Sequence, residues 1–220
     1  MRRLVCSFVG LGLFAQAPEA RARGGGGELW FAADVHGQWL RRLPMLESEA
    51  VETDTRAVPK GEHVVPGALA LLGVQVAFGF TVDDRIVLPL SGASVGTSIG
   101  SYRRVRTSVD GSIAELHPWT TSHWTLLLPG LGVRGKDRRL QWQVLVRPGV
   151  GWTAMGGQVA AAGQAAELSA TASTFTLRAE GELCRRLDPV SRVCLFAGPT
   201  LYEHGWLNGG LAGLRWEGGP

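Results

Sequence analysis

The chain has 220 residues, of which 45% are hydrophobic and only 19% are charged, and it contains 31 glycines and eight tryptophans. This length fits a single domain, and no apolar run reaches the roughly 18–20 residues that a membrane-spanning helix needs. The composition therefore excludes a helical membrane protein. The formal net charge of +3 is too small to indicate a nucleic-acid partner.

The first residues have the pattern of an export signal. Two arginines open the chain, residues 4–15 form an apolar run, and Ala20-Arg21-Ala22 is a small-x-small cleavage site. We therefore predict a cleavable signal peptide over residues 1–22, the alternative being a cytosolic chain with an apolar start. Its removal leaves 19 Lys and Arg against 18 Asp and Glu, so the basic balance owes much to the signal.

The next segments alternate apolar and polar residues with the period of two that a half-buried strand requires. A first strand is predicted over residues 29–39 and a second over 72–80. The acidic, proline-containing segment 42–65 between them is interpreted as a long loop. A tight turn at residues 82–84 leads into a third strand, which starts at Arg85.

Asp110-Gly111 is a strong two-residue hairpin signal. If it forms the turn, the third strand runs to about Val109 and the fourth returns from about Ser112 to Arg134. Both strands would then stand well beyond a bilayer as a protruding hairpin. The alternative is an ordinary loop over residues 97–120.

The clearest alternation lies between Leu140 and Trp152, where every second residue is apolar, and it predicts the fifth strand. It follows a turn at residues 135–137. The Gly/Ala/Gln-rich segment 155–171 is interpreted as a loop, with a short helix over 158–168 as the alternative. Further strands are predicted over 174–183, 193–201 and 207–216, with a turn at residues 188–191.

An even number of strands, with short turns on one side and longer loops on the other, is typical of bacterial outer-membrane barrels. The chain resembles small eight-stranded outer-membrane β-barrel proteins of the OmpA/OmpX or OmpW kind, over about residues 28–216. The resemblance implies an all-β fold, an up-and-down antiparallel transmembrane β-barrel of about eight strands, occupying residues 23–220. The segment 208–216, which ends in Trp216, is similar to the assembly signal of such barrels, but residues 217–220 follow it.

The resemblance also implies a location in the bacterial outer membrane, with outer-membrane lipid, lipopolysaccharide and the barrel assembly machinery as partners. No cofactor or metal site is expected, and the oligomeric state is not predicted. Aromatic residues at strand ends are expected to form two girdles at the membrane interfaces. The lower girdle would hold Phe31, Phe80, Trp142 and Trp216, and the upper one Trp39, Trp152, Phe175 and Trp206. Trp142 and Trp152 lie ten positions apart, which corresponds to roughly 23–25 Å of height in a tilted strand.

Polar residues on the opposite strand faces are expected to point into the lumen. This set comprises Asp34, His36, Gln38, Gln75, Arg134, Gln141, Gln143, Arg147, Arg178, Glu180, Glu182 and Arg215. An eight-stranded barrel is only just wide enough for side chains to fill it, and buried charges need partners. Counting back from the loop between the fifth and sixth strands places Arg147 near Glu180. We predict an ion pair there within a closed plug, the alternative being a narrow or gated pore.

Other groups leave alternatives open. Cys184 and Cys194 flank a predicted turn and both stand at even positions, which would put their side chains on the same face of the sheet. A cross-strand disulfide and a pair of free thiols both fit this placement. Catalysis would need a set such as His117, Ser122, His123, Glu203 and His204 near the outer rim, and no catalytic residue is predicted. Arg103, Arg104 and Arg106 fit either lipopolysaccharide phosphates or a solvated strand face.

The sequence thus predicts an integral outer-membrane barrel with a structural, surface-interaction or narrow-pore role, and no enzyme. A secreted soluble β-sandwich or a lipocalin-like binding module is the alternative, and a lipid-modifying barrel enzyme is a further one. The direction of the strand faces separates the first two, because a soluble barrel would pack Val144, Val146 and Val150 inside.

Overall fold

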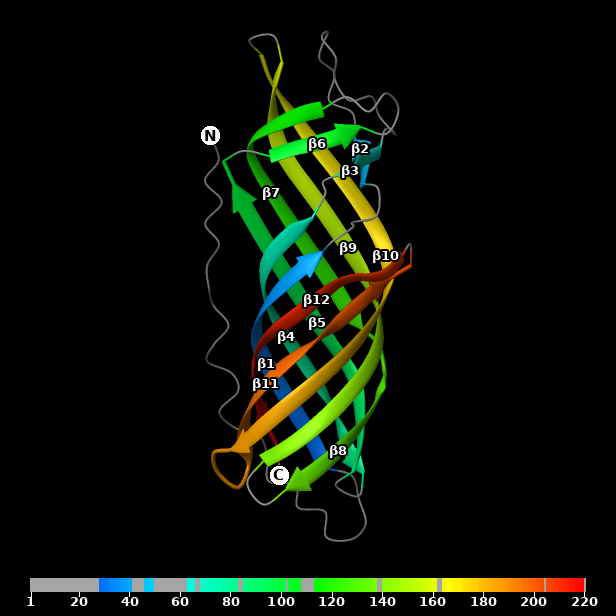
Figure 1. Cartoon of the computed structure of the whole chain (residues 1–220), viewed down its shortest axis with the longest axis vertical. Helices are drawn as coiled ribbons and strands as arrows, with labels where there is room; N and C mark the ends of the chain where they lie inside the picture. Colours follow the sequence, from blue (N-terminus) through cyan, green and yellow to red (C-terminus); the bar gives the residue numbers. More distant parts are fainter. Residues whose placement is uncertain are drawn as a thin grey trace.

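A computed structural model of the chain describes residues 28–40, 46–49, 63–65, 68–82, 85–101, 103–107, 113–137, 140–161, 164–203 and 205–219. The regular structure in these ranges is all β-strand (Figure 1). No helix long and apolar enough to cross a membrane occurs among the described residues. The predicted signal peptide, residues 1–22, lies outside them.

Twelve strands lie in the described ranges. They are β1 (Glu28–Leu40), β2 (Leu46–Glu49), β3 (His63–Val65), β4 (Leu69–Val82), β5 (Ile86–Gly100), β6 (Arg103–Thr107), β7 (Ile113–Leu127), β8 (Leu131–Asp137), β9 (Leu140–Ala161), β10 (Gln164–Arg186), β11 (Ser191–Tyr202) and β12 (Gly205–Gly218). Antiparallel pairing closes them into a barrel, with β1 paired to both β4 and β12.

The main wall has eight strand positions, because β7 and β8 share one. Both strands pair with β5 on one side and with β9 on the other. Between them, the Leu128 N–H donates to the Pro148 carbonyl and the Gly130 N–H to the Pro89 carbonyl, both at 2.9 Å. Pro129 has no N–H to donate, so the strand is locally irregular there but stays bonded to its neighbours. The predicted up-and-down barrel of about eight strands is confirmed.

The two ends of the described chain lie together at the lower end of the barrel (Figure 1), where Phe31 of β1 is the register partner of Gly218 of β12. The predicted turn at residues 188–191 joins β10 to β11 at this end. The turn predicted at 135–137 was placed too early, because β8 continues to Asp137 and β9 begins at Leu140. The tight turn at residues 83–84 lies outside the described residues.

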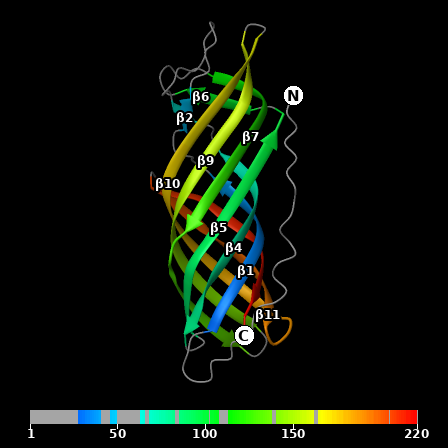
Figure 2. The same cartoon turned by 180° about the vertical axis from the view of Figure 1, so that it is seen from behind.

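Three strands continue above the main wall and form a second, smaller ring with short partners. β7, β9 and β10 extend upward, with β9 paired to both of the others. β10 also pairs with β2, β2 with β3, β3 with β6 and β6 with β7, which closes the ring. Figures 1 and 2 show the extension rising above the ends of β1, β4, β11 and β12. The pairing of β6 with β7 forms the protruding hairpin predicted around Asp110-Gly111, whose turn residues lie outside the described ranges.

Two sequence interpretations are therefore wrong. The segment 42–65 contains β2 and β3, which pair with β10 and β6 rather than forming only a loop. The segment 155–171 is mostly strand, because β9 runs to Ala161 and β10 begins at Gln164. In β2, β3 and the upper ends of β9 and β10, cross-strand pairing supplies the backbone hydrogen bonds although the sequence lacks a clear alternation there.

Side chains alternate between the two faces of the wall, and the apolar ones face outward. Val35 is 55% exposed and Leu72 69%, whereas the neighbouring Asp34 is only 5% exposed. Val144 and Val146 are exposed, and Leu145 and Arg147 between and beside them are buried. Contiguous apolar surfaces of this extent are rare on soluble monomers. The barrel therefore has the inside-out polarity of membrane-spanning barrels, not that of a soluble one.

Candidate functional site in the barrel lumen

The structure places every residue of the predicted inward set on the interior face. Eleven of the twelve are buried, and Gln141 is partly exposed near the lower end. These side chains come from β1, β4, β8, β9, β10 and β12, so they fill the lumen from most sides of the wall. The interior is thus a polar core enclosed by an apolar shell.

Arg147 and Glu180 meet inside the lumen. Strands β9 and β10 pair along their whole length, with Arg147 opposite Arg178 and Leu145 opposite Glu180. The Arg147 guanidinium reaches diagonally from β9 and donates to both Glu180 carboxylate oxygens, at 2.6 and 2.7 Å. Both side chains are at most 1% exposed, so the pair is fully removed from bulk solvent.

Arg215 of β12 is the centre of the network. It donates to Asp34 of β1 and to Glu180 of β10, each at 2.9 Å, and it also contacts Glu182. The guanidinium carbon lies 4.4 Å from the Phe196 ring centroid, a cation–π arrangement. One buried cation therefore connects carboxylates from two walls of the barrel.

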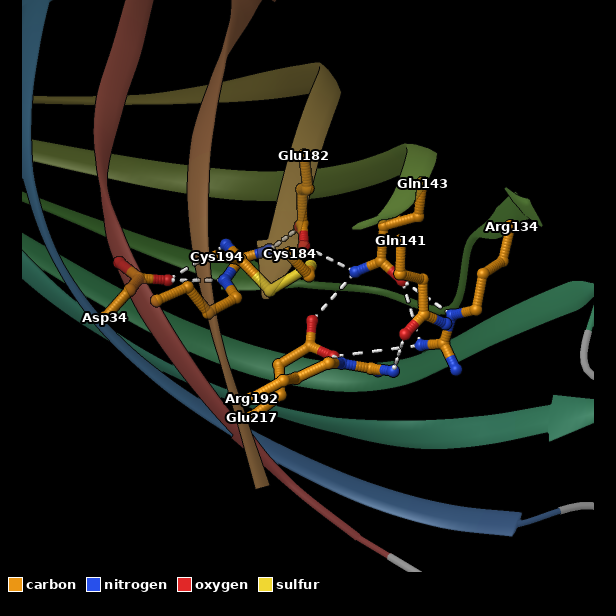
Figure 3. The surroundings of a disulfide bond; sticks show 10 residues. Asp34, Arg134, Gln141, Gln143, Glu182, Cys184, Arg192, Cys194 and Glu217 are labelled. Atoms are coloured by element: carbon orange, nitrogen blue, oxygen red, sulfur yellow. Dashed lines mark hydrogen bonds and ion pairs between the residues drawn. A yellow bond between two sulfur atoms is a disulfide. The ribbon is translucent and has the colours of Figure 1, made fainter. Parts of the chain in front are cut away.

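A second group of side chains lies nearer the lower end of the barrel, where Arg192 is the register partner of Glu217. Figure 3 shows how these side chains point toward one another. Gln143 accepts from the Arg134 guanidinium at 2.8 and 3.0 Å and donates to Glu217 at 2.7 Å and to Glu182. Arg192 of β11 contacts Glu217 and donates to Gln141 at 2.9 Å.

The sequence reasoning missed Arg192 and Glu217. The alternation of faces along a strand indicates both, because residues two positions apart share a face. Glu217 is two positions beyond Arg215, and Arg192 is two positions before Cys194. The predicted last strand ends at Trp216, whereas β12 continues to Gly218, so Glu217 lies within the strand.

Cys184 and Cys194 form a disulfide, which resolves the alternative left open by the sequence. They are direct register partners on β10 and β11 and are buried in the lumen (Figure 3). A Glu182 carboxylate oxygen lies within 4.8 Å of both sulfurs. Because bonded sulfurs are not thiolates, this grouping offers a metal ion no cysteine ligand in the present state.

The upper part of the lumen holds fewer charges and more hydroxyl and apolar groups. Arg178 donates to Gln75 at 2.7 Å and to Thr125 at 3.1 Å. His123 contacts Thr125 and Thr153. Higher still, the interior holds buried apolar side chains, which include Leu40, Leu69, Leu71, Leu116, Trp119, Met155 and Leu211.

The geometry does not support the catalytic set that the sequence allowed. His123 is buried in the lumen, whereas its neighbour Ser122 lies on the opposite face of β7. His117 and Glu203 are exposed, and His204 lies outside the described residues. A serine and its general base must lie within hydrogen-bond reach of each other, and opposite faces of one strand prevent that.

Seven of the eight predicted interface aromatics are exposed on the outer face of the wall. They are Phe31, Trp39, Phe80, Trp142, Trp152, Phe175 and Trp216; the side chain of Trp206 lies outside the described part. The sequence reasoning overlooked Trp124, which is 54% exposed and stands opposite Trp152 in the β7–β9 register.

Comparison with known proteins gives structural neighbours only. No protein-family model and no curated protein sequence matches the chain. Neisserial surface protein A overlaps it with a TM-score of 0.46 and 7% identity, covering 86% of this chain and 96% of that one. Ail, the attachment invasion locus protein of Yersinia pestis, gives 0.43 and 12%, covering 88% and 97%. The outer membrane protein OprG from Pseudomonas aeruginosa gives 0.40 and 12%, covering 88% and 96%.

Proposed function

We propose that this protein is an integral β-barrel of the bacterial outer membrane with a closed lumen, acting as a structural and surface-contact protein and not as an enzyme. The observation that carries the proposal is the direction of the wall faces. Apolar side chains such as Val144 and Leu195 cover the outside, while arginines and carboxylates fill the inside. In water this arrangement would expose the apolar surface and bury the charges, both unfavourable, whereas a bilayer makes the first favourable.

Closure of the lumen follows from its side-chain network. Ion pairs and hydrogen bonds connect β12 with β1 and β10, β9 with β10, and β8 with β9 and β12. The apolar group above them forms a second barrier to water and ions. We therefore expect the lumen to conduct poorly, in preference to the narrow-pore role.

The experiment combines membrane fractionation, heat-modifiable gel mobility and conductance in planar bilayers. We expect the protein in the outer-membrane fraction, with folded and boiled forms migrating differently and little ion current. A soluble protein whose mobility does not change on boiling would refute the membrane proposal. A steady current through an otherwise membrane-inserted protein would refute only the closed lumen.

The upper ring gives the protein a surface beyond the main wall. β7, β9 and β10 stand above the ends of the other wall strands, and the short strands β2, β3 and β6 complete the ring. If the main wall spans the bilayer, this ring stands on the cell surface. It is the part best placed for contacts with molecules outside the cell.

Outer-leaflet lipid is the partner that the wall itself favours. A hollow of about 400 Å³ on the wall is flanked by Trp124 and Trp152 and includes Thr171 and Ser173 of β10. Tryptophan beside hydroxyl groups suits the interface between acyl chains and lipopolysaccharide sugars. The arginine side chains of β6 lie outside the described part. Recognition of the C-terminal strand by the barrel assembly machinery also belongs to this proposal.

A further inference from the structure

Arg178 differs from the other arginines of the described lumen in having no carboxylate partner. Arg134 and Arg192 pair with Glu217, Arg147 pairs with Glu180, and Arg215 pairs with several carboxylates. Arg178 is completely buried. Its hydrogen bonds go only to neutral groups, the Gln75 side-chain oxygen, the Thr125 hydroxyl and, at 3.5 Å, the Ser94 hydroxyl.

Several donors around Arg178 have no acceptor within hydrogen-bond distance. The Nε of Arg178 has no hydrogen-bond partner. Gln75 accepts from Arg178 through its side-chain oxygen, but its side-chain nitrogen has no partner either. Arg147 is the register partner of Arg178, and its Nε and Nη1 are also unpartnered. These are four N–H-bearing nitrogens on three buried side chains. Unmet donors of this kind are strongly unfavourable in a protein interior.

Hydroxyl groups beside Arg178 share the deficit. Thr200 of β11 is the register partner of Arg178, and Thr176 precedes it by two positions on the same face of β10. Both hydroxyls are buried and have no hydrogen-bond partner. A hydroxyl can donate as readily as it can accept, so both can turn their hydrogens toward an acceptor placed near Arg178.

The nearest carboxylate on this strand is already committed. Glu180 accepts from Arg147 and Arg215, so it serves two cations before any contact with Arg178. Water could satisfy some of the donors, but it would not neutralise the buried guanidinium. A group that supplies both acceptors and one negative charge is needed.

We propose that the lumen binds a small inorganic anion of chloride size at Arg178, held by the unpartnered donors of Arg178, Arg147 and Gln75 and by the hydroxyls of Thr176 and Thr200. The anion compensates the buried charge of Arg178 and supplies acceptors to the unpartnered donors around it. This site goes beyond the structural role proposed above, and it concerns the lumen whatever the upper ring contacts.

The test measures stability against chloride. Purified barrel in detergent is unfolded at constant ionic strength, with chloride exchanged for gluconate, a much larger anion. Once the site is near saturation, the unfolding equilibrium constant should fall about tenfold for each tenfold rise in chloride. Arg178→Gln should abolish this dependence. Arg192→Gln, which removes a lumen arginine that has its own carboxylate, should retain it.

A second measurement covers the case in which Arg178→Gln fails to fold. Crystals of the unmodified protein grown in bromide should show an anomalous peak within hydrogen-bond distance of Arg178. Stability that does not depend on chloride, or a middle lumen that holds only water in bromide, would overturn the proposal. Equal chloride dependence in Arg178→Gln and the unmodified protein would overturn it as well.

Discussion

Replacing Glu180 by Gln should strongly destabilise the barrel. Glu180 is the only carboxylate within ion-pair distance of Arg147 among the described residues, and both side chains are buried. Loss of its charge leaves Arg147 uncompensated in the interior, which typically costs about 3–5 kcal/mol. Arg215 also loses one partner but keeps Asp34 and Glu182. We therefore assign most of the loss to Arg147.

The assay is denaturant unfolding of the barrel in lipid vesicles, followed by the fraction that keeps folded gel mobility. Asp34→Asn is the matched control, because Arg215 then keeps two carboxylates, and its loss should be smaller, about 1–3 kcal/mol. Combining Glu180→Gln with Arg147→Met removes the stranded cation, so the double variant should be more stable than Glu180→Gln alone. A loss below about 1 kcal/mol for Glu180→Gln, or a double variant that shows the sum of the two single losses, would refute the reasoning.

Three further outcomes are expected. Val146→Arg on the outer face should destabilise the barrel in lipid by about 2–4 kcal/mol, measured by the same unfolding assay; an unchanged midpoint would contradict a lipid-facing position. Cys184→Ala with Cys194→Ala should lower stability by no more than about 3 kcal/mol, because the bond closes a short loop; failure to fold would contradict this, and reductant should reproduce the loss. In the turn, hydrogen bonds from the Ser191 hydroxyl and from backbone N–H groups lower the pKa of Asp188. Ionised Asp188 should therefore stabilise the folded barrel above the ordinary aspartate pKa, and this stabilisation should disappear as pH falls through the lowered pKa. NMR titration of the Asp188 carboxyl is the check, and an ordinary pKa would contradict the turn geometry.

The wall was predictable because its two faces differ chemically. Between Leu140 and Trp152 apolar residues alternate with residues that are polar or small except for Leu145, and this period fixes both the strand and the direction of each side chain. The contact of Arg147 with Glu180 followed from parity and from counting along one hairpin. Both inferences used only local spacing.

The upper ring was not predictable by the same means. In the sequence of residues 155–171 small residues stand at both odd and even positions, so no alternation separates a strand from a loop. β2 and β3 are short, and their partners lie far away in sequence, for example Glu47 opposite Thr171. Such short strands form because they pair with the exposed edges of neighbouring strands, and their own sequence pattern does not indicate them. The lack of a carboxylate partner at Arg178 likewise depends on which side chains the barrel brings together.

The central claim is that the wall faces lipid outside and polar groups inside. Spin labels placed one at a time at Val144, Val146 and Trp152 in the vesicle-embedded protein test it most directly, with collision rates measured for oxygen and for a water-soluble nickel complex. Oxygen is concentrated in the bilayer centre, so the two valine positions should favour oxygen strongly and the Trp152 position, near the interface, less so. Equal or greater access of the nickel complex at Val144 and Val146 would contradict the account.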